Sequence, residues 1–141
     1  MKRYVLGFAL TPEMDRVALI QKNRPDWQAG KWNGIGGHIE DGESPLEAMH
    51  REFQEETGVY IAKERWISMG EMGSDDWNCR LFYFLGYESV VVNTMTDEKV
   101  MVHNIQDLRK GSVQFADPNV GLFLSLAMMQ GPVIKEIYLA Y

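Results

Sequence analysis

The first part of the chain alternates short apolar runs with turn residues, a pattern that indicates paired β-strands. Residues 4–10 are rich in strand-favouring side chains, and residues 17–20 form a short, continuous apolar run. Residues 11–15 lie between them, are mostly polar and include Pro12, which is typical of a turn. We therefore predict a hairpin of two strands that enters the core.

A predicted loop and a glycine-rich strand follow the hairpin. Residues 23–31 include Pro25, Asp26 and Gly30 and predict the loop, whereas residues 32–40 read W-N-G-I-G-G-H-I-E. Glycine loses more entropy on ordering than other residues, so its repeated use indicates close approach of the backbone to another group. A bulged strand without a ligand gives the same composition. The acidic helix that comes next favours the ligand-binding interpretation.

Apolar spacing changes to the helical period after residue 44. Leu46, Met49 and Phe53 recur at this spacing and are expected to face the core. The capping signals are complete, with an N-cap serine, a proline at the first helical position, a capping-box glutamate and a C-terminal glycine: Ser44, Pro45, Glu47 and Gly58. Together they predict a helix of about 13 residues with a fixed extent and rotation.

The remaining apolar runs predict further strands and a second long helix. Extended structure is expected at residues 59–61, 65–72, 77–87, 90–92 (continuing or re-pairing the previous strand), 100–103 and 133–141. Residues 107–111 predict a turn of helix that ends at glycine. Residues 119–130 predict a helix with Leu122, Leu126 and Met129 at helical spacing. This order indicates a single α+β domain over residues 1–141, with a mixed sheet packed between helices.

Composition and charge narrow the class of ligand. A chain of 141 residues is long enough for one domain with a real core, and its 45% hydrophobic content is ordinary for a soluble globular protein. The net charge of −6 argues against binding of polymeric nucleic acid, because that affinity comes from Lys and Arg neutralising phosphates. A small phosphorylated ligand remains compatible with an acidic protein when a divalent metal supplies positive charge.

The cysteine content and the first residues bear on the compartment. Cys79 is the single cysteine, so no intramolecular disulfide forms, which fits a reducing, cytoplasmic compartment. Lys2 and Arg3 precede a short apolar run, as in a signal peptide, but the run stops at Thr11 and no small-x-small cleavage site follows. A first β-strand is the better interpretation. No apolar run approaches the roughly 20 residues that span a bilayer, so no membrane partner is expected.

The predicted first helix carries the strongest candidate chemistry. Glu52, Glu55 and Glu56 stand at i, i+3 and i+4 and so share one face. Oxygen ligands suit a hard divalent cation, Mg²⁺ or Mn²⁺, rather than zinc, and Mg²⁺ usually keeps substrate phosphates among its ligands. A solvated acidic face is the alternative. Arg51 and Glu43 favour the metal site, because a bidentate pair between them would fix the helix and the preceding loop.

At this point the chain resembles a known family. Residues 37–59 match the Nudix signature, G-x5-E-x7-R-E-U-x-E-E-x-G-U, at every position: Gly37, Glu43, Arg51, Glu52, Phe53, Glu55, Glu56, Gly58 and Val59. The resemblance implies the Nudix α/β/α sandwich and hydrolysis of nucleoside diphosphates linked to another moiety by attack of water on phosphorus. It also implies that this chain's substrate is a small nucleotide.

The same resemblance implies roles for individual residues. Glu52, Glu55, Glu56 and the carbonyl of Gly37 would hold the metal, and Glu43 with Arg51 would orient the helix and loop. The metal would lower the pKa of a water molecule and neutralise phosphate oxygens. The general base would be a glutamate on this helix or Glu98, which resembles an additional loop glutamate of many family members. An exposed turn acid is the alternative for Glu98.

Flanking residues point to a substrate. Residues 30–37 look like the corresponding stretch of MutT-like purine nucleoside triphosphatases, which implies base contact by Asn33, and residues 115–119 resemble the segment that closes over the base there. The expected base-contacting residues are Asn33, with Asp117 or Asn119, and the expected stacking residues are Phe115 or Trp27. We therefore expect Mg²⁺-dependent hydrolysis of a nucleoside triphosphate, such as 8-oxo-dGTP or another purine deoxynucleotide, to a monophosphate and pyrophosphate.

Two other functions and one structural question stay open. ADP-ribose or another nucleoside diphosphate sugar is an alternative substrate, and a Nudix module that senses nucleotides without turnover is a second alternative. The intact set of three glutamates argues against the sensor. Monomer and homodimer are both compatible with the sequence, because the apolar residues 133–139 can pair at an edge of their own sheet or with another subunit. We favour their own sheet.

Overall fold

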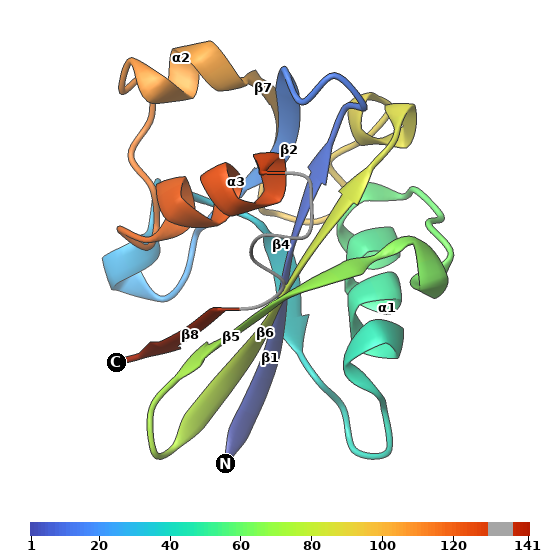
Figure 1. Cartoon of the computed structure of the whole chain (residues 1–141), viewed down its shortest axis with the longest axis vertical. Coiled ribbons are helices and arrows are strands. Elements are labelled where there is room, and N and C mark those ends of the chain that lie inside the picture. Colours follow the sequence, from blue (N-terminus) through green and yellow to red (C-terminus); the bar gives the residue numbers. More distant parts are fainter. Residues whose placement is uncertain (130–136) are drawn as a thin grey trace.

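A mixed sheet of eight strands forms the centre of the structure, a computed structural model that describes residues 1–129 and 137–141 (Figure 1). The strands are β1 (Lys2–Leu10), β2 (Arg16–Gln21), β3 (Trp32–Asn33), β4 (Ile35–His38), β5 (Ile67–Gly73), β6 (Trp77–Leu85), β7 (Val100–Asn104) and β8 (Ile137–Ala140). The α-helices are α1 (Pro45–Thr57), α2 (Ile105–Arg109) and α3 (Val120–Met128). Short 3₁₀ helices occur at Asp26–Gln28, Lys63–Arg65 and Tyr87–Val90. The strand order is β3-β2-β1-β6-β5-β8, with β4 paired to β1 and β7 to β2.

β1 is the central strand and is buried on both faces, which explains its continuous apolar run. It pairs in parallel with β6 along its whole length, and antiparallel with β2 and β4. Leu6, Phe8 and Leu10 enter one core cluster, while Val5 and Ala9 enter the other, as the period of two in a strand requires. The predicted hairpin of the first two strands is confirmed.

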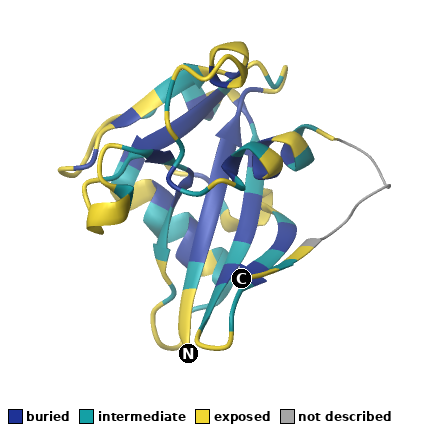
Figure 2. Ribbon diagram, turned by 90° about the vertical axis from the view of Figure 1, so that its left-hand side faces the viewer, coloured by how far each residue is buried: buried dark blue, intermediate teal, exposed yellow. Residues whose placement is uncertain are grey.

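Helices cover both faces of the sheet. α1 buries Ala48, Met49 and Phe53 in the core on one face. α3 buries Phe123 and Leu124 in the core on the opposite face, where α2 also packs. The two helical layers lie on either side of the strands in Figure 1, and the central strands are the most deeply buried elements in Figure 2. The predicted α+β class and the α/β/α sandwich with a mixed sheet are confirmed.

Two predicted strands are wrong. Residues 59–61 do not join the sheet; the carbonyl of Ile61 instead lies 2.7 Å from His50 Nδ1 of α1. Residues 90–92 also leave the sheet, because the chain forms the 3₁₀ helix Tyr87–Val90 and then returns to the end of α1, where the N–H of Asn93 donates to the carbonyl of Thr57 (3.0 Å). Apolar β-branched residues favour a strand, but tertiary contacts decide whether one forms.

The apolar residues at helical spacing in the last predicted helix do not all face the core. Leu122 and Met129 are 43% and 56% exposed, whereas Val120, Phe123 and Ala127 are buried. Almost every residue of α3 is apolar, so helical spacing alone did not distinguish the inner face from the outer one. α2 begins two residues earlier than predicted, because Asn104 Oδ1 caps it by accepting from the N–H of Gln106 (2.9 Å).

β8 places the end of the chain inside the sheet. It pairs in parallel with β5, from Gly70↔Ile137 to Gly73↔Ala140, which confirms the favoured pairing with its own sheet. The rest of the predicted strand, residues 133–136, lies outside the described residues. In the described part of the chain, no helix combines the length and apolar character needed to cross a bilayer.

Candidate metal and nucleotide site

α1 is fixed at both ends as its sequence predicts. The N–H of Glu47 donates to Ser44 Oγ (3.1 Å), and the N–H of Ser44 donates to Glu47 Oε1 (3.3 Å), which completes the capping box. Gly58 ends the helix in the left-handed region with φ 76°, a conformation that favours glycine. These caps set the rotation of α1 and therefore the positions of its glutamates.

The three helical glutamates differ in their surroundings. The side chain of Glu52 is 13% exposed and that of Glu55 is 58% exposed, while Glu56 is partly buried. In residues 1–129 and 137–141, no three carboxylate, imidazole or thiol groups lie close enough together to hold a metal ion as they stand. The question is therefore whether their surroundings fit a cation.

The backbone of β4 lies against the carboxylate of Glu52. A Cβ atom added at Gly37 would lie 2.5 Å from Glu52 Oε1 and 2.7 Å from Oε2, so only glycine lets the strand approach this closely. Gly36 has a different role, because a Cβ there would lie 1.9 Å from the carbonyl oxygen of Val5 on β1. Thus one glycine serves strand packing, and Gly37 brings the backbone to the carboxylates.

Glu56 supplies the clearest indication that the site fits a cation. Its Oε2 is buried and has no hydrogen-bond partner among the described atoms. Burial raises the pKa of Glu56 to about 8, the charge of Glu52 adds to the effect, and the charge of Lys22 opposes it. A buried carboxylate needs a hydrogen bond or a counter-charge. Hard oxygen donors of this kind fit Mg²⁺ or Mn²⁺, so the residues present fit a divalent cation.

Glu56 predicts how the stability of the metal-free protein depends on pH. Between its ordinary pKa of 4.5 and its folded-state pKa of about 8, the native state binds more protons than the unfolded state, so the free energy of unfolding falls as pH rises through this window. We expect Glu56→Gln to remove a loss on the order of 2 kcal/mol between pH 5 and 8, after allowance for screening by water.

Urea unfolding of wild type and Glu56→Gln in chelator at pH 5, 6.5 and 8 measures this contribution to the free energy of unfolding. The difference between the two proteins isolates Glu56, because other titrating groups contribute to both. Addition of Mg²⁺ at pH 8 should stabilise wild type more than the variant. The same pH slope in both proteins would contradict the assignment.

Arg51 joins the helix to the loop before it. Its Nε and Nη2 donate to Glu43 Oε2 (2.7 Å) and Oε1 (2.9 Å), and Nη2 also donates to the carbonyl of His38 (2.9 Å). Its Nη1 donates to Glu52 Oε1 (2.9 Å) and to Glu55 Oε2 (3.2 Å). The bond to Arg51 holds the pKa of Glu43 below its ordinary value. The bidentate geometry expected for Glu43 and Arg51 is present.

Glu98 is a buried member of the site's surroundings, so its interpretation as an exposed turn acid is wrong. It is 6% exposed. Its carboxylate accepts from Lys22 Nζ (3.0 Å) and from the N–H of Asn23 (2.7 Å). Its charge raises the pKa of Glu56, after the larger effects of burial, Glu52 and Lys22. The site thus includes a lysine that sequence analysis missed; its only signal was a basic residue just after the second apolar run.

The residues expected to contact a base lie mainly on two neighbouring segments. Asn33 is on β3, and its Oδ1 accepts from the N–H of the next residue (2.8 Å). Residues 115–119 run beside this strand, because Trp32 and Phe115 form a parallel bridge and the N–H of Ala116 donates to the carbonyl of Trp32 (2.8 Å). The structure therefore brings Asn33 beside the segment of Phe115, Asp117 and Asn119, although 82 residues separate Asn33 from Phe115 in the sequence (115 − 33).

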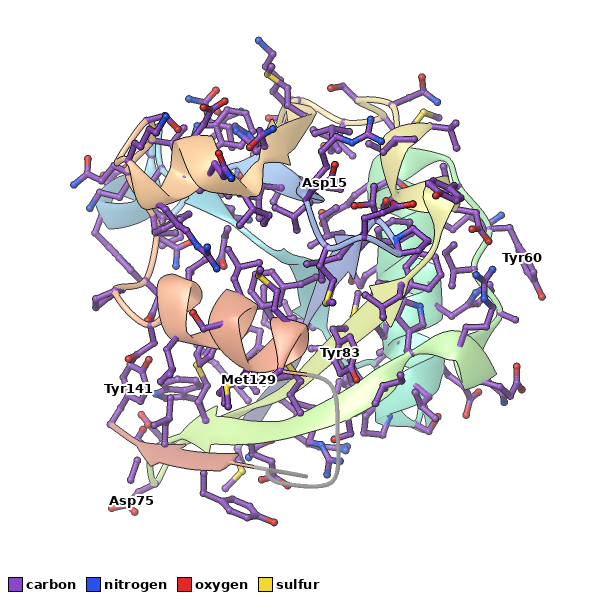
Figure 3. All side chains as sticks on the ribbon, turned by 45° about the horizontal axis from the view of Figure 1, so that its top comes forward. Asp15, Tyr60, Asp75, Tyr83, Met129 and Tyr141 are labelled. Atoms are coloured by element: carbon purple, nitrogen blue, oxygen red, sulfur yellow. The ribbon has the colours of Figure 1, made fainter. Side chains whose placement is uncertain are left out.

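The two aromatic residues expected to stack on a base differ in their exposure. Phe115 is partly buried against the core cluster that contains Trp32, whereas Trp27 is 61% exposed on the 3₁₀ helix Asp26–Gln28. Sequence analysis also missed Tyr141, whose hydroxyl contacts Asp117 and Asn119. Tyr141 lies beside the first turn of α3 in Figure 3. The predicted strand 133–141 gave no indication of that contact.

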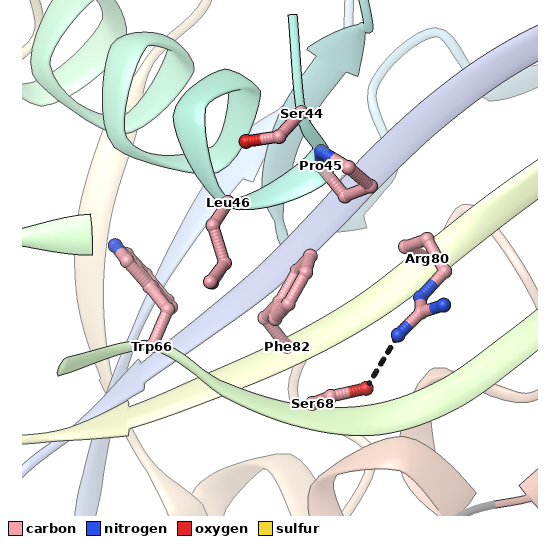
Figure 4. Close-up of a pocket in the computed structure, with 7 residues that line it drawn as sticks. All are labelled: Ser44, Pro45, Leu46, Trp66, Ser68, Arg80 and Phe82. Atoms are coloured by element: carbon pink, nitrogen blue, oxygen red, sulfur yellow. Dashed lines mark hydrogen bonds between the residues drawn. The ribbon is translucent and has the colours of Figure 1, made fainter. Parts of the chain in front are cut away.

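A separate cavity of about 340 Å³ lies at the beginning of α1. Figure 4 shows its walls, formed by Ser44, Pro45, Leu46, Trp66, Ser68, Arg80 and Phe82. Pro45 and Glu56 are about 16 Å apart along the helix axis at 1.5 Å per residue, so this cavity is distinct from the carboxylate site. The bond from Arg80 Nη2 to Ser68 Oγ (3.1 Å) crosses its edge.

Comparison with known proteins agrees with this geometry. The family model described as NUDIX domain matches residues 1–119. The chain is 30% identical over 102 residues to the uncharacterized Nudix hydrolase YvcI of Bacillus subtilis (strain 168), covering 67% of this chain and 62% of that protein. It is 40% identical over 57 residues to the oxidized purine nucleoside triphosphate hydrolase of Danio rerio, covering 40% and 36%. The chain thus spans less than two thirds of the length of both relatives.

Solved structures share the fold. The MutT protein from Bacillus halodurans has a TM-score of 0.72 at 21% identity, covering 100% of this chain and 90% of that one. The NUDIX domain of Shewanella oneidensis NrtR, complexed with ADP ribose, has a TM-score of 0.72 at 16% identity, covering 89% and 85%. Such identities show the fold alone, whereas the family match covers most of the chain. The chain therefore belongs to the NUDIX domain family.

Proposed function

We propose that this Nudix hydrolase cleaves a purine nucleoside triphosphate, such as 8-oxo-dGTP, into the nucleoside monophosphate and pyrophosphate. Two observations carry the catalytic part: the buried Oε2 of Glu56 has no hydrogen-bond partner in the described part of the chain, and Glu52 lies in close contact with Gly37. Nudix hydrolases use divalent cations, and we propose Mg²⁺ here, with Mn²⁺ as a substitute. Glu52, Glu55, Glu56 and the carbonyl of Gly37 would hold it.

Individual residues have separate roles in the proposed reaction. The bound cation supplies positive charge to the phosphate oxygens and acidifies water. Arg51 keeps Glu52 and the loop through Glu43 in place. Glu98 accepts the proton of the attacking water, because Lys22 and a backbone N–H hold its carboxylate in a fixed orientation while Glu56 serves as a ligand.

The purine preference rests on the segment beside β3. Asn33 presents an amide, and Asp117 with Asn119 presents a carboxylate and a second amide from the neighbouring segment. Amide and carboxylate groups together supply the donors and acceptors that read a purine edge. The Danio rerio relative is named for oxidized purine nucleoside triphosphates. We also propose a reducing, cytoplasmic location, since the single cysteine, Cys79, is free and buried.

A substrate panel tests the proposal. Purified protein with Mg²⁺ is incubated with 8-oxo-dGTP, dGTP, dATP, dCTP and ADP-ribose, and products are identified by ³¹P NMR and ion-exchange chromatography. We expect monophosphate and pyrophosphate, with the largest kcat/KM for a purine triphosphate. Production of orthophosphate, or a preference for dCTP, would contradict the proposal.

ADP-ribose is the second candidate, because the NrtR domain that shares this fold is complexed with it. Release of AMP and ribose phosphate at a higher kcat/KM than any triphosphate would establish this alternative. Binding of a nucleotide without any product in Mg²⁺ or Mn²⁺ would instead identify a sensor.

A further inference from the structure

The hydroxyl of Tyr141 connects Asp117 and Asn119, two polar residues that precede α3. It donates to Asp117 at 3.0 Å from both Oδ1 and Oδ2, and it accepts from Asn119 Nδ2 at 2.5 Å. Partial burial raises the pKa of Tyr141 above its ordinary value of 10. The hydroxyl therefore remains a protonated donor at neutral pH, and both of its hydrogen-bonding capacities are in use.

The sheet holds this tyrosine in position from the opposite side. The N–H of Tyr141 donates to the carbonyl of Gly73 (2.8 Å), which extends the parallel pairing of β8 with β5. Its ring meets the ring of Trp77 edge-on, with centroids 5.5 Å apart. The pairing with β5 and the ring of Trp77 thus fix the hydroxyl, whereas Asp117 lies on an irregular segment, where its Oδ1 also accepts from the N–H of Asn119 (2.7 Å).

The contacts of Asp117 occupy its two carboxylate oxygens unequally. A carboxylate oxygen accepts about two hydrogen bonds. Oδ1 receives the N–H of Asn119 and shares the Tyr141 hydroxyl, so it is saturated, whereas among the described residues Oδ2 receives only its share of that hydroxyl. The hydroxyl also accepts from the amide of Asn119, which restricts rotation of that side chain. Oδ2 therefore keeps acceptor capacity for a bound group.

We propose that Tyr141 is a positioning residue that determines base specificity by fixing the carboxylate of Asp117 and the amide of Asn119. This inference rests on the proposed function, because it assigns the origin of selectivity within the same nucleotide site. The fixed carboxylate of Asp117 and the fixed amide of Asn119 together select the base edge, because a base must pair with both groups at once. Tyr141 acts through Asp117 and does not contact the reacting phosphates.

Tyr141→Phe removes the hydroxyl and retains the ring against Trp77. We expect KM for the preferred purine triphosphate to rise about tenfold, the effect of weakening one hydrogen bond to a charged group. The ratio of its kcat/KM to that of dCTP should fall by a similar factor, while kcat changes less than twofold. Tyr60→Phe, which removes a hydroxyl from a 65% exposed residue and retains the ring against His50, is the matched control and should leave the ratio unchanged.

A double-mutant cycle separates positioning from general stabilisation. If Tyr141 acts through Asp117 and Asn119, Tyr141→Phe should have no further effect on the selectivity ratio in a background in which both residues are alanine. An effect of Tyr141→Phe in that background equal to its effect in wild type would overturn the inference, as would an unchanged ratio in Tyr141→Phe alone. Failure of wild type to hydrolyse any triphosphate would instead refute the proposed function, and the inference with it. Thermal unfolding of each variant shows whether loss of fold accounts for a change.

Discussion

Replacing Glu56 by glutamine is expected to lower kcat by roughly 10³-fold or more, the effect of removing a group that acts on transition-state charge. The amide cannot bind a cation as a carboxylate does. It does match the shape and neutrality of the protonated Glu56 that the buried site favours at neutral pH, so the fold should persist. Steady-state kinetics with Mg²⁺ measure kcat, titration calorimetry with Mn²⁺ measures cation binding, and thermal unfolding shows whether the fold persists.

Two further variants serve as controls for the Glu56→Gln result. Glu64→Gln changes an exposed glutamate of the 3₁₀ helix Lys63–Arg65 and should leave kcat unaltered. Glu98→Gln removes the proposed base, so kcat should fall while Mn²⁺ affinity stays within about threefold of wild type, whereas Glu56→Gln should lose both. Turnover by Glu56→Gln at the wild-type rate would refute the metal site.

Local signals predicted the helix that carries this site. Ser44, Pro45, Glu47 and Gly58 act within a few residues of one another, so the sequence contains all the information needed to begin and end α1. The grouping of the glutamates follows from helical spacing alone. What spacing cannot provide is burial: Glu55 is exposed and Glu52 is covered by the strand of Gly37, because that difference depends on how β4 folds back on the helix.

Long-range contacts account for what sequence analysis missed. Lys22 and Glu98 are 76 residues apart and meet only because β2 pairs with β7, which follows the loop of Glu98. Tyr141 reaches Asp117 through the pairing of β8 with β5. The inner face of α3 could not be predicted for a different reason, since a helix that is apolar on almost all sides has no periodic signal. Pairing between distant strands is thus the information that the single sequence lacks.

Arg51→Met is expected to destabilise the protein by about 2 kcal/mol and to lower kcat/KM by on the order of 100-fold, in the range for breaking a partly buried ion pair and for losing a residue that supports metal ligands. The side chains of Arg51, Glu43 and Glu52 are 22%, 14% and 13% exposed. Methionine would leave both carboxylates without their shared partner, and the loop before α1 would lose its bond through His38.

The variant also predicts a pH signature. Arg51 lowers the pKa of Glu43 from its ordinary value of 4.5, so the unfolded state binds more protons as pH falls below that value. The stabilisation by this pair is therefore present at neutral pH and is lost in acid, as pH falls through the folded-state pKa of Glu43. The difference in unfolding free energy between wild type and Arg51→Met should shrink from pH 7 to pH 3, as measured by urea unfolding.

Arg51→Lys separates charge from geometry. Lysine keeps the positive charge but presents a point charge in place of a planar fork, so it cannot bond Glu43 Oε1 and Oε2, Glu52 and the His38 carbonyl together, as Arg51 does. It should recover most of the stability and little of the activity, because Glu52 stays charge-compensated while the loop and helix lose their fixed relation. Full activity in Arg51→Lys would show that charge alone suffices, and that the fork plays no part in holding Glu52 beneath Gly37.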